Sequence, residues 1–305
     1  MPDLNMPQFP MFVPLELKDQ EVFQTFFSAY RPEISELTFT NLFIWRSHYK
    51  FQWSIYRDWL VIISVEGEYG TFAIEPIGPS PRYEITRLVL EWMRDEKNVK
   101  NSRIERADNR IVEEVRGING ISVEPTRDHF DYVYLRDDLV KLGGNRYRSK
   151  RNHINQLVRA YLYRYEQLAP DHINDCIAVQ EKWCLLRRCE DDMDLIGEWD
   201  AVKEILRCYM NLNVQGAVIT IENKVVAFTI GQMLNENTAV IHIEKADPEI
   251  PGLYPVINQQ FCENNWQGVR YINREQDLGI PGLREAKLSY YPDHMVNKFR
   301  ITLNQ

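Results

Sequence analysis

The chain has 305 residues, of which 44% are apolar and 12% are aromatic. This is enough apolar material for one large core or two medium cores. The charged fraction of 26% is ordinary for a folded domain and excludes bulk disorder. A net charge of −8 argues against nucleic-acid binding that is driven by overall charge.

The sequence lacks several familiar signals. Its N-terminal residues have neither the basic region nor the apolar segment of a signal peptide, and no run approaches the roughly 18 apolar residues of a spanning helix. We therefore expect no transmembrane segment and a cytoplasmic protein. The six histidines show no metal-ligand spacing, and no Cys-x-x-Cys pair exists, so we expect no metal site and no tightly bound cofactor. His242 alternates along an expected strand, which indicates a packed side chain.

Short β-rich runs and amphipathic runs follow one another in the first part of the chain. Residues 1–14 are Pro-rich and predict an extended arm, and apolar side chains at helical spacing predict a helix over 17–30. The other expected elements are a helical entry at 35–45, strands at 49–56, 59–65 and 70–74, a helix at 81–95, a strand at 103–107, a short helix at 110–116, and strands at 123 and 130–135. Early hairpins followed by βα alternation are typical of an α+β (or α/β-like) domain with a mixed sheet.

A Leu-Gly-Gly-Asn stretch at 142–145 interrupts this pattern and predicts a domain boundary. We divide the chain into an N-terminal domain (1–142), a basic linker helix (143–160) and a C-terminal domain (161–305). The expected later elements are helices at 170–187 and 198–210, a hairpin of 216–222 with 224–233, a strand at 238–244, a helix at 254–264, a strand at 269–272 and a closing segment at 297–303.

Residues 139–165 contain seven Lys or Arg and no Asp or Glu. The cations are Lys141, Arg146, Arg148, Lys150, Arg151, Arg159 and Arg164. One interpretation is a solvated linker helix. The other is a basic strip that meets the phosphates of CoA, tRNA or a lipid head group. From this strip we take Asn145, Arg148, Lys150 and Arg151 as candidate substrate-binding residues.

Charged side chains also cluster where the last central strand ends. The strand at 269–272 is followed by a group of polar side chains, then by a Gly-Ile-Pro-Gly turn and a short helix. The candidates in this stretch are Asn273, Arg274, Glu275, Asp277, Lys287, Tyr290 and Tyr291. Charges ordered beside glycines at a strand end are typical of functional loops, although a solvated loop with an internal salt bridge is the alternative.

Three blocks carry a resemblance: SELTFTNLFIWR at 35–46, LGGNRYRSKRNHINQ at 142–156 and INREQDLGIPGLREAKLSYYP at 272–292. Together they resemble an uncharacterised bacterial family related to the C-terminal domain of phosphatidylglycerol lysyltransferase. The resemblance spans most of the chain. It implies two tandem GNAT-like acyltransferase domains, each a mixed, mostly antiparallel sheet flanked by helices, as in the Fem-type aminoacyl-tRNA-dependent transferases.

Aminoacyl transfer needs a base, donors for a tetrahedral oxyanion and an acid for the leaving oxygen. Glu244, Asp277 and Glu275 are the candidate bases. Arg274, Lys287 and Asn273 are the candidate donors, and Tyr290 or Tyr291 is the candidate acid. We take Glu244, Asp277, Lys287 and Tyr290 as catalytic and the others as substrate-binding. For each, the alternative is a buried ion pair that only holds the loop.

The resemblance also bears on the donor. In acetyl-CoA users the position of residues 246–255 is a Gly-rich phosphate loop, but here it has one glycine, Gly252, and two acids, Asp247 and Glu249, which repel pyrophosphate. The leading function is therefore transfer from aminoacyl-tRNA to an amine or hydroxyl of a lipid head group, peptide or small molecule, with tRNA bound through 139–165. An acyl-CoA-dependent N-acyltransferase and a non-catalytic GNAT-like binding module are the alternatives.

Overall fold

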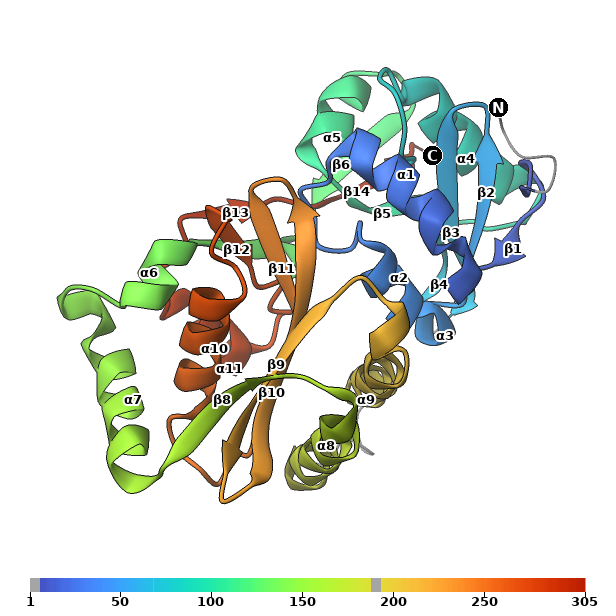
Figure 1. The fold of residues 1–305 in the computed structure, drawn as a ribbon. Helices are drawn as coiled ribbons and strands as arrows, with labels where there is room; N and C mark the ends of the chain where they lie inside the picture. The colour runs from blue at the N-terminus through green and yellow to red at the C-terminus, as the bar shows by residue number, and fades with distance from the viewer. Residues whose placement is uncertain (1–5, 68, 188–192, 305) are drawn as a thin grey trace. The chain divides into compact units, whose positions relative to one another are not determined.

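A computed structural model describes residues 6–67, 69–187 and 193–304 of the chain (Figure 1). The chain divides into two compact units. The first unit comprises Met1–Asp131, Gln276–Ile280 and Met295–Gln305, and the second comprises Tyr132–Glu275 and Pro281–His294. The units thus change over at Asp131, before the boundary predicted after residue 142, and the C-terminal part of the chain is shared between them.

The first unit is built on a seven-stranded sheet with the order β1-β2-β3-β4-β5-β14-β6. Its strands are β1 (Val13–Pro14), β2 (Phe51–Tyr56), β3 (Trp59–Gly67), β4 (Gly70–Ile74), β5 (Arg103–Ala107), β6 (Ile121–Pro125) and β14 (Phe299–Leu303). Its helices are α1 (Gln20–Tyr30), α2 (Phe39–Ile44), α3 (Arg46–Tyr49), α4 (Tyr83–Asp95) and α5 (Asn109–Val115). Only the β4–β5 pair in this sheet is described as parallel.

The core of the first unit lies between this sheet and α4. Ile85, Val89 and Met93 recur four residues apart along α4, so they share one face of the helix and are fully buried. They pack in one cluster with sheet residues, among them Ile104 of β5 and Ile301 of β14. The C-terminal strand is therefore an integral part of the first core.

The second unit is built on another seven-stranded sheet, with the order β13-β7-β12-β11-β10-β9-β8. Its strands are β7 (Asp131–Leu135), β8 (Tyr163–Gln167), β9 (Gln215–Ile221), β10 (Lys224–Asn235), β11 (Thr238–Ala246), β12 (Tyr271–Asn273) and β13 (His294–Val296). Its helices are α6 (Arg136–Lys141), α7 (Arg148–Ala160), α8 (Ile173–Arg187), α9 (Met193–Arg207), α10 (Leu253–Asn264) and α11 (Pro281–Leu288).

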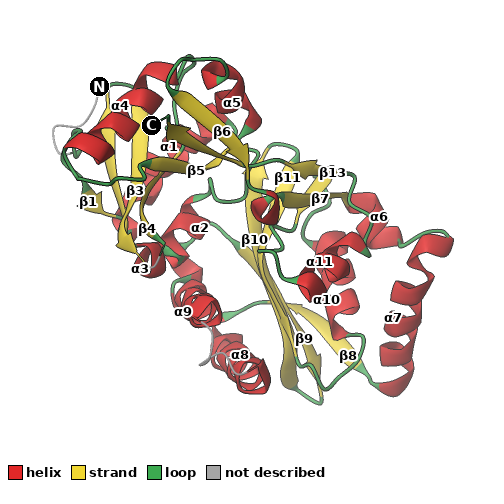
Figure 2. Cartoon of the chain, turned by 180° about the vertical axis from the view of Figure 1, so that it is seen from behind, coloured by secondary structure: helices red, strands yellow, loops and turns green. Residues whose placement is uncertain are grey.

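Helices cover both faces of this second sheet. Figure 2 shows α8 and α9 on one side, with α10, α11 and α7 on the other. α10 and α7 meet the sheet through an apolar cluster that includes Leu157, Val256 and Ile257. Gly252 begins α10 with a φ of +92°, and a Cβ there would lie 2.4 Å from the backbone oxygen of His153, so α7 and α10 approach too closely for any other residue.

The second sheet has two irregularities. β11 and β12 pair in parallel only from Thr238↔Tyr271 to Val240↔Asn273, so the rest of β11 has no partner in β12. In the pairing with β10, Ile243 lies opposite Ile230 whereas Ile241 lies opposite Gly231, so His242 is the extra residue of a β-bulge. Bulges bend a strand and redirect a side chain, often beside active sites.

Candidate active site

Arg274 and Glu244 form a largely buried ion pair at the point where β11 and β12 separate. Nη2 of Arg274 lies 2.8 Å from Oε1 of Glu244, and the two side chains are 15% and 11% exposed. Oε2 of Glu244 accepts a hydrogen bond of 3.0 Å from Nδ2 of Asn258 on α10. Both oxygens of this carboxylate are therefore engaged, which leaves it little capacity to act as a base.

Two polar atoms, one in this pair and one in Asn258, are buried without a hydrogen-bond partner among the described residues. They are Nη1 of Arg274 and Oδ1 of Asn258. A buried polar group left unsatisfied costs roughly 1–3 kcal/mol, and such groups mark places where a ligand or water is expected. The site thus offers a ligand one hydrogen-bond donor, on the positively charged Arg274, and one acceptor, on Asn258.

Lys150 and Tyr290 complete the surroundings of Arg274. Nζ of Lys150, from α7, donates to Oγ of Ser289 at 2.7 Å and lies 4.0 Å from the centre of the Tyr290 ring. Cζ of Arg274 lies 4.8 Å from the centre of the same ring. The aromatic face therefore lies beside two cations that would otherwise repel each other.

These contacts change the acidity of the groups. Burial, followed by the positive charge of Arg274, lowers the pKa of Lys150 to about 8. Burial also raises the pKa of Tyr290 well above its ordinary value, although Arg274 opposes this. For Arg274 itself, burial lowers the pKa, but Glu244 and the nearby tyrosines outweigh burial and raise it overall. At neutral pH the site therefore holds a permanent guanidinium and an ammonium that readily gives up its proton.

The remaining polar residues of the loop after β12 hold its backbone. Nζ of Lys287 donates to the backbone oxygen of Arg274 and, at 3.4 Å, to that of Glu275. Oδ1 of Asn273 accepts a hydrogen bond of 2.8 Å from the backbone N–H of Glu275. These contacts support Glu275 in a left-handed conformation with a φ of +56°, which a residue with a Cβ adopts only at some cost.

Glu275 makes a contact that the sequence pattern did not reveal. Its Oε1 lies 2.9 Å from Nδ1 of His242, whose side chain is 1% exposed. The sequence interpretation of His242 as a packed histidine rested on strand alternation. His242 is the extra residue of the bulge in β11, and no local pattern predicts a bulge between Ile241 and Ile243.

Asp277 has a different set of partners. It belongs to the first unit, where its side chain is fully buried and its Oδ2 lies 3.3 Å from Nη1 of Arg127. Its Oδ1 accepts the backbone N–H of Gly279 at 2.9 Å. Asp277 therefore shapes the turn, whereas Glu244, Lys287 and Tyr290 lie together in the second unit.

The candidates from the basic segment have different surroundings. Arg151 donates to the backbone oxygens of Leu142 and, at 2.7 Å, of Gly144, so it closes the turn before α7. Asn145 and Arg148 are exposed, and only Lys150 reaches Arg274 and Tyr290. Tyr291 is 44% exposed and packs edge-on against the ring of Tyr147.

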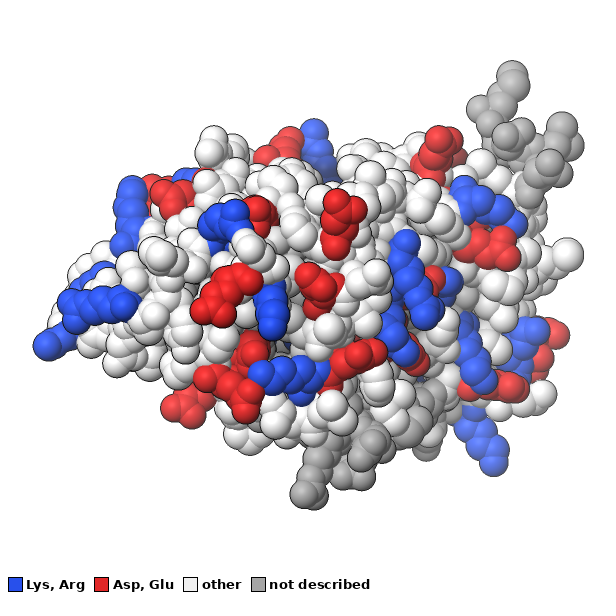
Figure 3. All heavy atoms as spheres, turned by 60° about the horizontal axis from the view of Figure 1, so that its bottom comes forward, with Lys and Arg blue, Asp and Glu red and all other residues white. Residues whose placement is uncertain are grey.

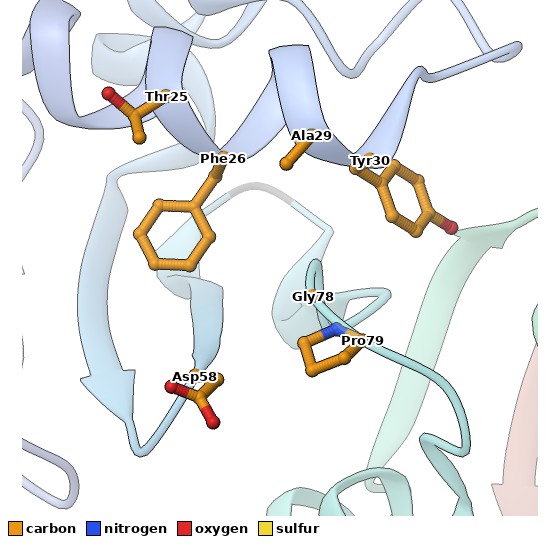
Figure 4. Close-up of a pocket in the computed structure, with 7 residues that line it drawn as sticks. All are labelled: Thr25, Phe26, Ala29, Tyr30, Asp58, Gly78 and Pro79. Atoms are coloured by element: carbon orange, nitrogen blue, oxygen red, sulfur yellow. The ribbon is translucent and has the colours of Figure 1, made fainter.

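A separate cavity of about 370 Å³ opens on the first unit, and its lining contains none of the residues predicted from the sequence. Figure 4 shows the side chains of Phe26, Ala29 and Tyr30 extending from α1 near the loop at Gly78 and Pro79. Asp58 is the charged residue of this lining.

Within residues 6–67, 69–187 and 193–304, no group of three or more His, Cys, Asp or Glu is arranged to hold a metal ion. In the same part of the chain, no helix combines the length and the apolar character needed to cross a bilayer.

Solved structures match nearly the whole chain. A conserved protein of unknown function from Bacteroides thetaiotaomicron is 32% identical, with a TM-score of 0.88 over 96% of this chain and 99% of that one. L-PGS from Bacillus licheniformis is 14% identical, with a TM-score of 0.63 over 99% and 94% of the two chains.

FemX and a tandem GNAT protein from the clavulanic acid biosynthesis pathway match at the level of fold. FemX is 7% identical, with a TM-score of 0.56 over 96% of this chain and 97% of its own. The tandem GNAT protein is 10% identical, with a TM-score of 0.51 over 96% and 98% of the two chains. The predicted α+β fold with two tandem GNAT-like parts is confirmed.

A family comparison agrees with these structures. Residues 27–302 match the family described as "Phosphatidylglycerol lysyltransferase, C-terminal", which includes all three blocks of the expected resemblance. The relation to aminoacyltransferase domains indicates a transferase. The chain belongs to the phosphatidylglycerol lysyltransferase C-terminal domain family.

Proposed function

We propose that this protein is an aminoacyltransferase that moves an aminoacyl group from aminoacyl-tRNA to an amine or hydroxyl acceptor. The observation that carries the proposal is the buried Arg274, which Glu244 holds in place and whose Nη1 has no hydrogen-bond partner in the described part of the chain. A fixed donor in a site shielded from water stabilises the oxyanion that forms when a nucleophile attacks an ester.

The neighbouring groups supply the other parts of such a reaction. Lys150, with a pKa of about 8, is protonated at neutral pH and can give its proton to the ribose oxygen that leaves. Tyr290 is a poorer acid because burial raises its pKa, so we assign it to hydrogen bonding and to packing of the cations. Glu244, with both oxygens engaged, orients Arg274 rather than taking a proton.

The start of α10 favours aminoacyl-tRNA over acyl-CoA as the donor. Asp247 and Glu249 both lie close to Lys182, at 2.7 and 2.5 Å, so a cation of α8 is already paired in this loop. The backbone oxygen of His153 lies directly beside Gly252, the N-cap of α10. A pyrophosphate at this position would meet two carboxylates and a carbonyl oxygen, all of which repel it.

The basic segment contributes fewer available cations than its composition suggests. Lys141 pairs with Asp137 and Arg146 with Asp138, whereas Arg148 and Arg159 are exposed, without a described ion pair. Figure 3 shows Lys and Arg interspersed with Asp and Glu over the face it draws. We propose that tRNA phosphates meet Arg148 and Arg159 and that the acceptor is a lipid head group, a peptide or a small molecule.

The proposal is tested by equilibrium binding of total tRNA, aminoacylated in bulk, at two salt concentrations with acetyl-CoA as competitor. We expect salt-sensitive binding that acetyl-CoA does not displace. Replacing Arg148 and Arg159 by Glu should make the plot of log binding constant against log salt concentration less steep, by the amount expected for the loss of about two phosphate contacts. Binding of acetyl-CoA without tRNA would instead favour an acyl-CoA-dependent enzyme, and binding of neither would favour a non-catalytic module.

Transfer is measured on the same pool with phosphatidylglycerol vesicles and a peptide amine as acceptors. Replacing Arg274 by Gln should lower the single-turnover rate by about 10²- to 10³-fold, the usual loss when one oxyanion donor is removed. Arg270 offers a matched control, because it is an exposed arginine of the same segment that lies over the ring of Tyr271. Transfer by the Arg274→Gln variant at the wild-type rate would exclude the proposed role.

A further inference from the structure

His242 combines three features that no packing role requires. It is the extra residue of a β-bulge, its Nδ1 lies 2.9 Å from a carboxylate, and its Nε2 is buried with no hydrogen-bond partner among the described residues. Gly231 permits the bulge, because a Cβ at this position would lie 2.5 Å from the backbone oxygen of Val240. A glycine and a β-bulge together therefore set the position of this one imidazole.

The contact with Glu275 determines which ring nitrogen carries the proton. An ionised carboxylate only accepts hydrogen bonds, so Nδ1 of His242 is the donor in this pair. In the neutral ring the lone pair then lies on Nε2, which makes that atom the basic one. Glu275 also fixes the ring orientation, because Asn273 and Lys287 hold its backbone from two sides.

We propose that His242 is the general base of the aminoacyl transfer and that Glu275 is its positioning residue. This rests on the proposed function. The other carboxylates considered for the role are committed elsewhere, since Glu244 is bonded to Arg274 and Asn258, and Asp277 lies in the first unit with Arg127. Glu275, which contacts His242, directly follows Arg274, the proposed oxyanion donor.

Nε2 of His242 takes the proton from the acceptor's N–H or O–H while the acceptor atom bonds to the ester carbonyl carbon. The oxyanion faces Nη1 of Arg274. The bond between the carbonyl carbon and the ribose oxygen then breaks, and Lys150 gives this oxygen a proton. The imidazolium proton returns to Lys150 through solvent, so the protein ends unchanged.

The experiment is a single-turnover transfer assay with bulk-aminoacylated tRNA, phosphatidylglycerol vesicles and a peptide amine. His242→Asn should lower the rate about 10²- to 10⁴-fold. Glu275→Gln should also lower it, and Glu275→Asp, which keeps a carboxylate, should recover part of the loss. The tautomer of His242 is read separately by ¹⁵N NMR, in which wild type should carry the proton on Nδ1 and Glu275→Gln should shift it.

His294 provides a matched control, because its Nδ1 lies 2.8 Å from Oδ2 of Asp293 in a pair that is 45% and 36% exposed. His294→Asn should leave the rate unchanged. If wild type transfers and His242→Asn does so equally fast, His242 is not the base and the proposed function stands. If wild type transfers nothing, the proposed function and this role fail together. A proton on Nε2 in wild type would overturn the assignment whatever the activity.

Discussion

Lys150 has a side-chain amine whose surroundings lower its pKa to about 8, close to physiological pH. Burial and then Arg274 lower its pKa to about 8, so raising the pH through 8 removes the proton that we propose it donates. Activity should therefore decline above about pH 8. Lys150→Arg, which keeps its charge but cannot release a proton, should lower the rate about 10²-fold and abolish this decline. Lys203→Arg is the control, since Lys203 forms an ion pair with Asp200, three residues earlier on the same helix.

The ion pair of Glu244 and Arg274 should also matter for stability. Glu244→Ala leaves a buried guanidinium without its counter-charge, which typically costs about 3–5 kcal/mol in the free energy of unfolding. Glu249→Ala breaks a pair with Lys182 that is 65% and 43% exposed, and should cost less than about 1 kcal/mol. Urea denaturation measures both. Equal losses in the two variants would show that the first pair is solvated.

At the scale of the secondary-structure elements, β14 should be sensitive to the loss of one apolar side chain. Its Ile301 is fully buried, lies opposite Ile104 of β5 and Val123 of β6, and belongs to the core of the first unit. Ile301→Ala should lower the free energy of unfolding by about 2–5 kcal/mol. The neighbouring Thr302→Ala should stay within about 1 kcal/mol. A loss for Ile301→Ala no larger than for Thr302→Ala would mean that β14 is not part of the core.

Most helices and strands were predictable because their signals are local. The apolar spacing within 81–95 predicted α4, and the Glu222-Asn223 turn predicted the hairpin of β9 and β10. Which strands pair with each other was harder to predict from the sequence. The sequence placed 130–135 in the first half, yet β7 pairs with β12, and it could not show that β14 lies between β5 and β6. Such pairings depend on contacts between residues far apart in the chain.

The candidate site was predictable only in part, for the same reason. The composition of 271–292 drew attention to Arg274, Tyr290 and Lys287, which lie together in the second unit. It could not separate Asp277, one of several adjacent acids, from that group. His242 was predicted to be packed, and its side chain is 1% exposed, but its contact with Glu275 was not predictable because the bulge in β11 breaks strand alternation.

At the scale of the molecule, two titratable groups of the first unit, the partly buried His129 and the buried Glu75, should change stability with pH in opposite directions. Burial, then Arg106 and Lys298, lowers the pKa of His129 to about 3, from an ordinary 6.5. Its contribution to stability is complete above pH 6.5 and is lost as the pH falls toward 3. Burial, then Asp108, raises the pKa of Glu75 to about 8, from an ordinary 4.5. Its contribution is complete below pH 4.5 and is lost as the pH rises toward 8.

Between pH 4.5 and 6.5 these two contributions change with opposite sign and should cancel. His129→Gln should therefore make stability fall as the pH rises through this window, by up to about 1.4 kcal/mol per pH unit. Glu75→Gln should make it rise by a similar amount. Chemical denaturation at several pH values measures these slopes, and two variants with the wild-type slope would show that neither group is perturbed.

The place of β14 also sets an order of events during synthesis. A ribosome releases the chain from its N-terminus, so β5 and β6 emerge long before β14, the strand that joins them. The run from β7 through β12 to β8 in the other sheet is complete once residue 273 has emerged. Domains usually mature in the order in which they are translated. Here the unit that begins the chain is the last to be finished, and until then its open strand edges need protection from other nascent chains.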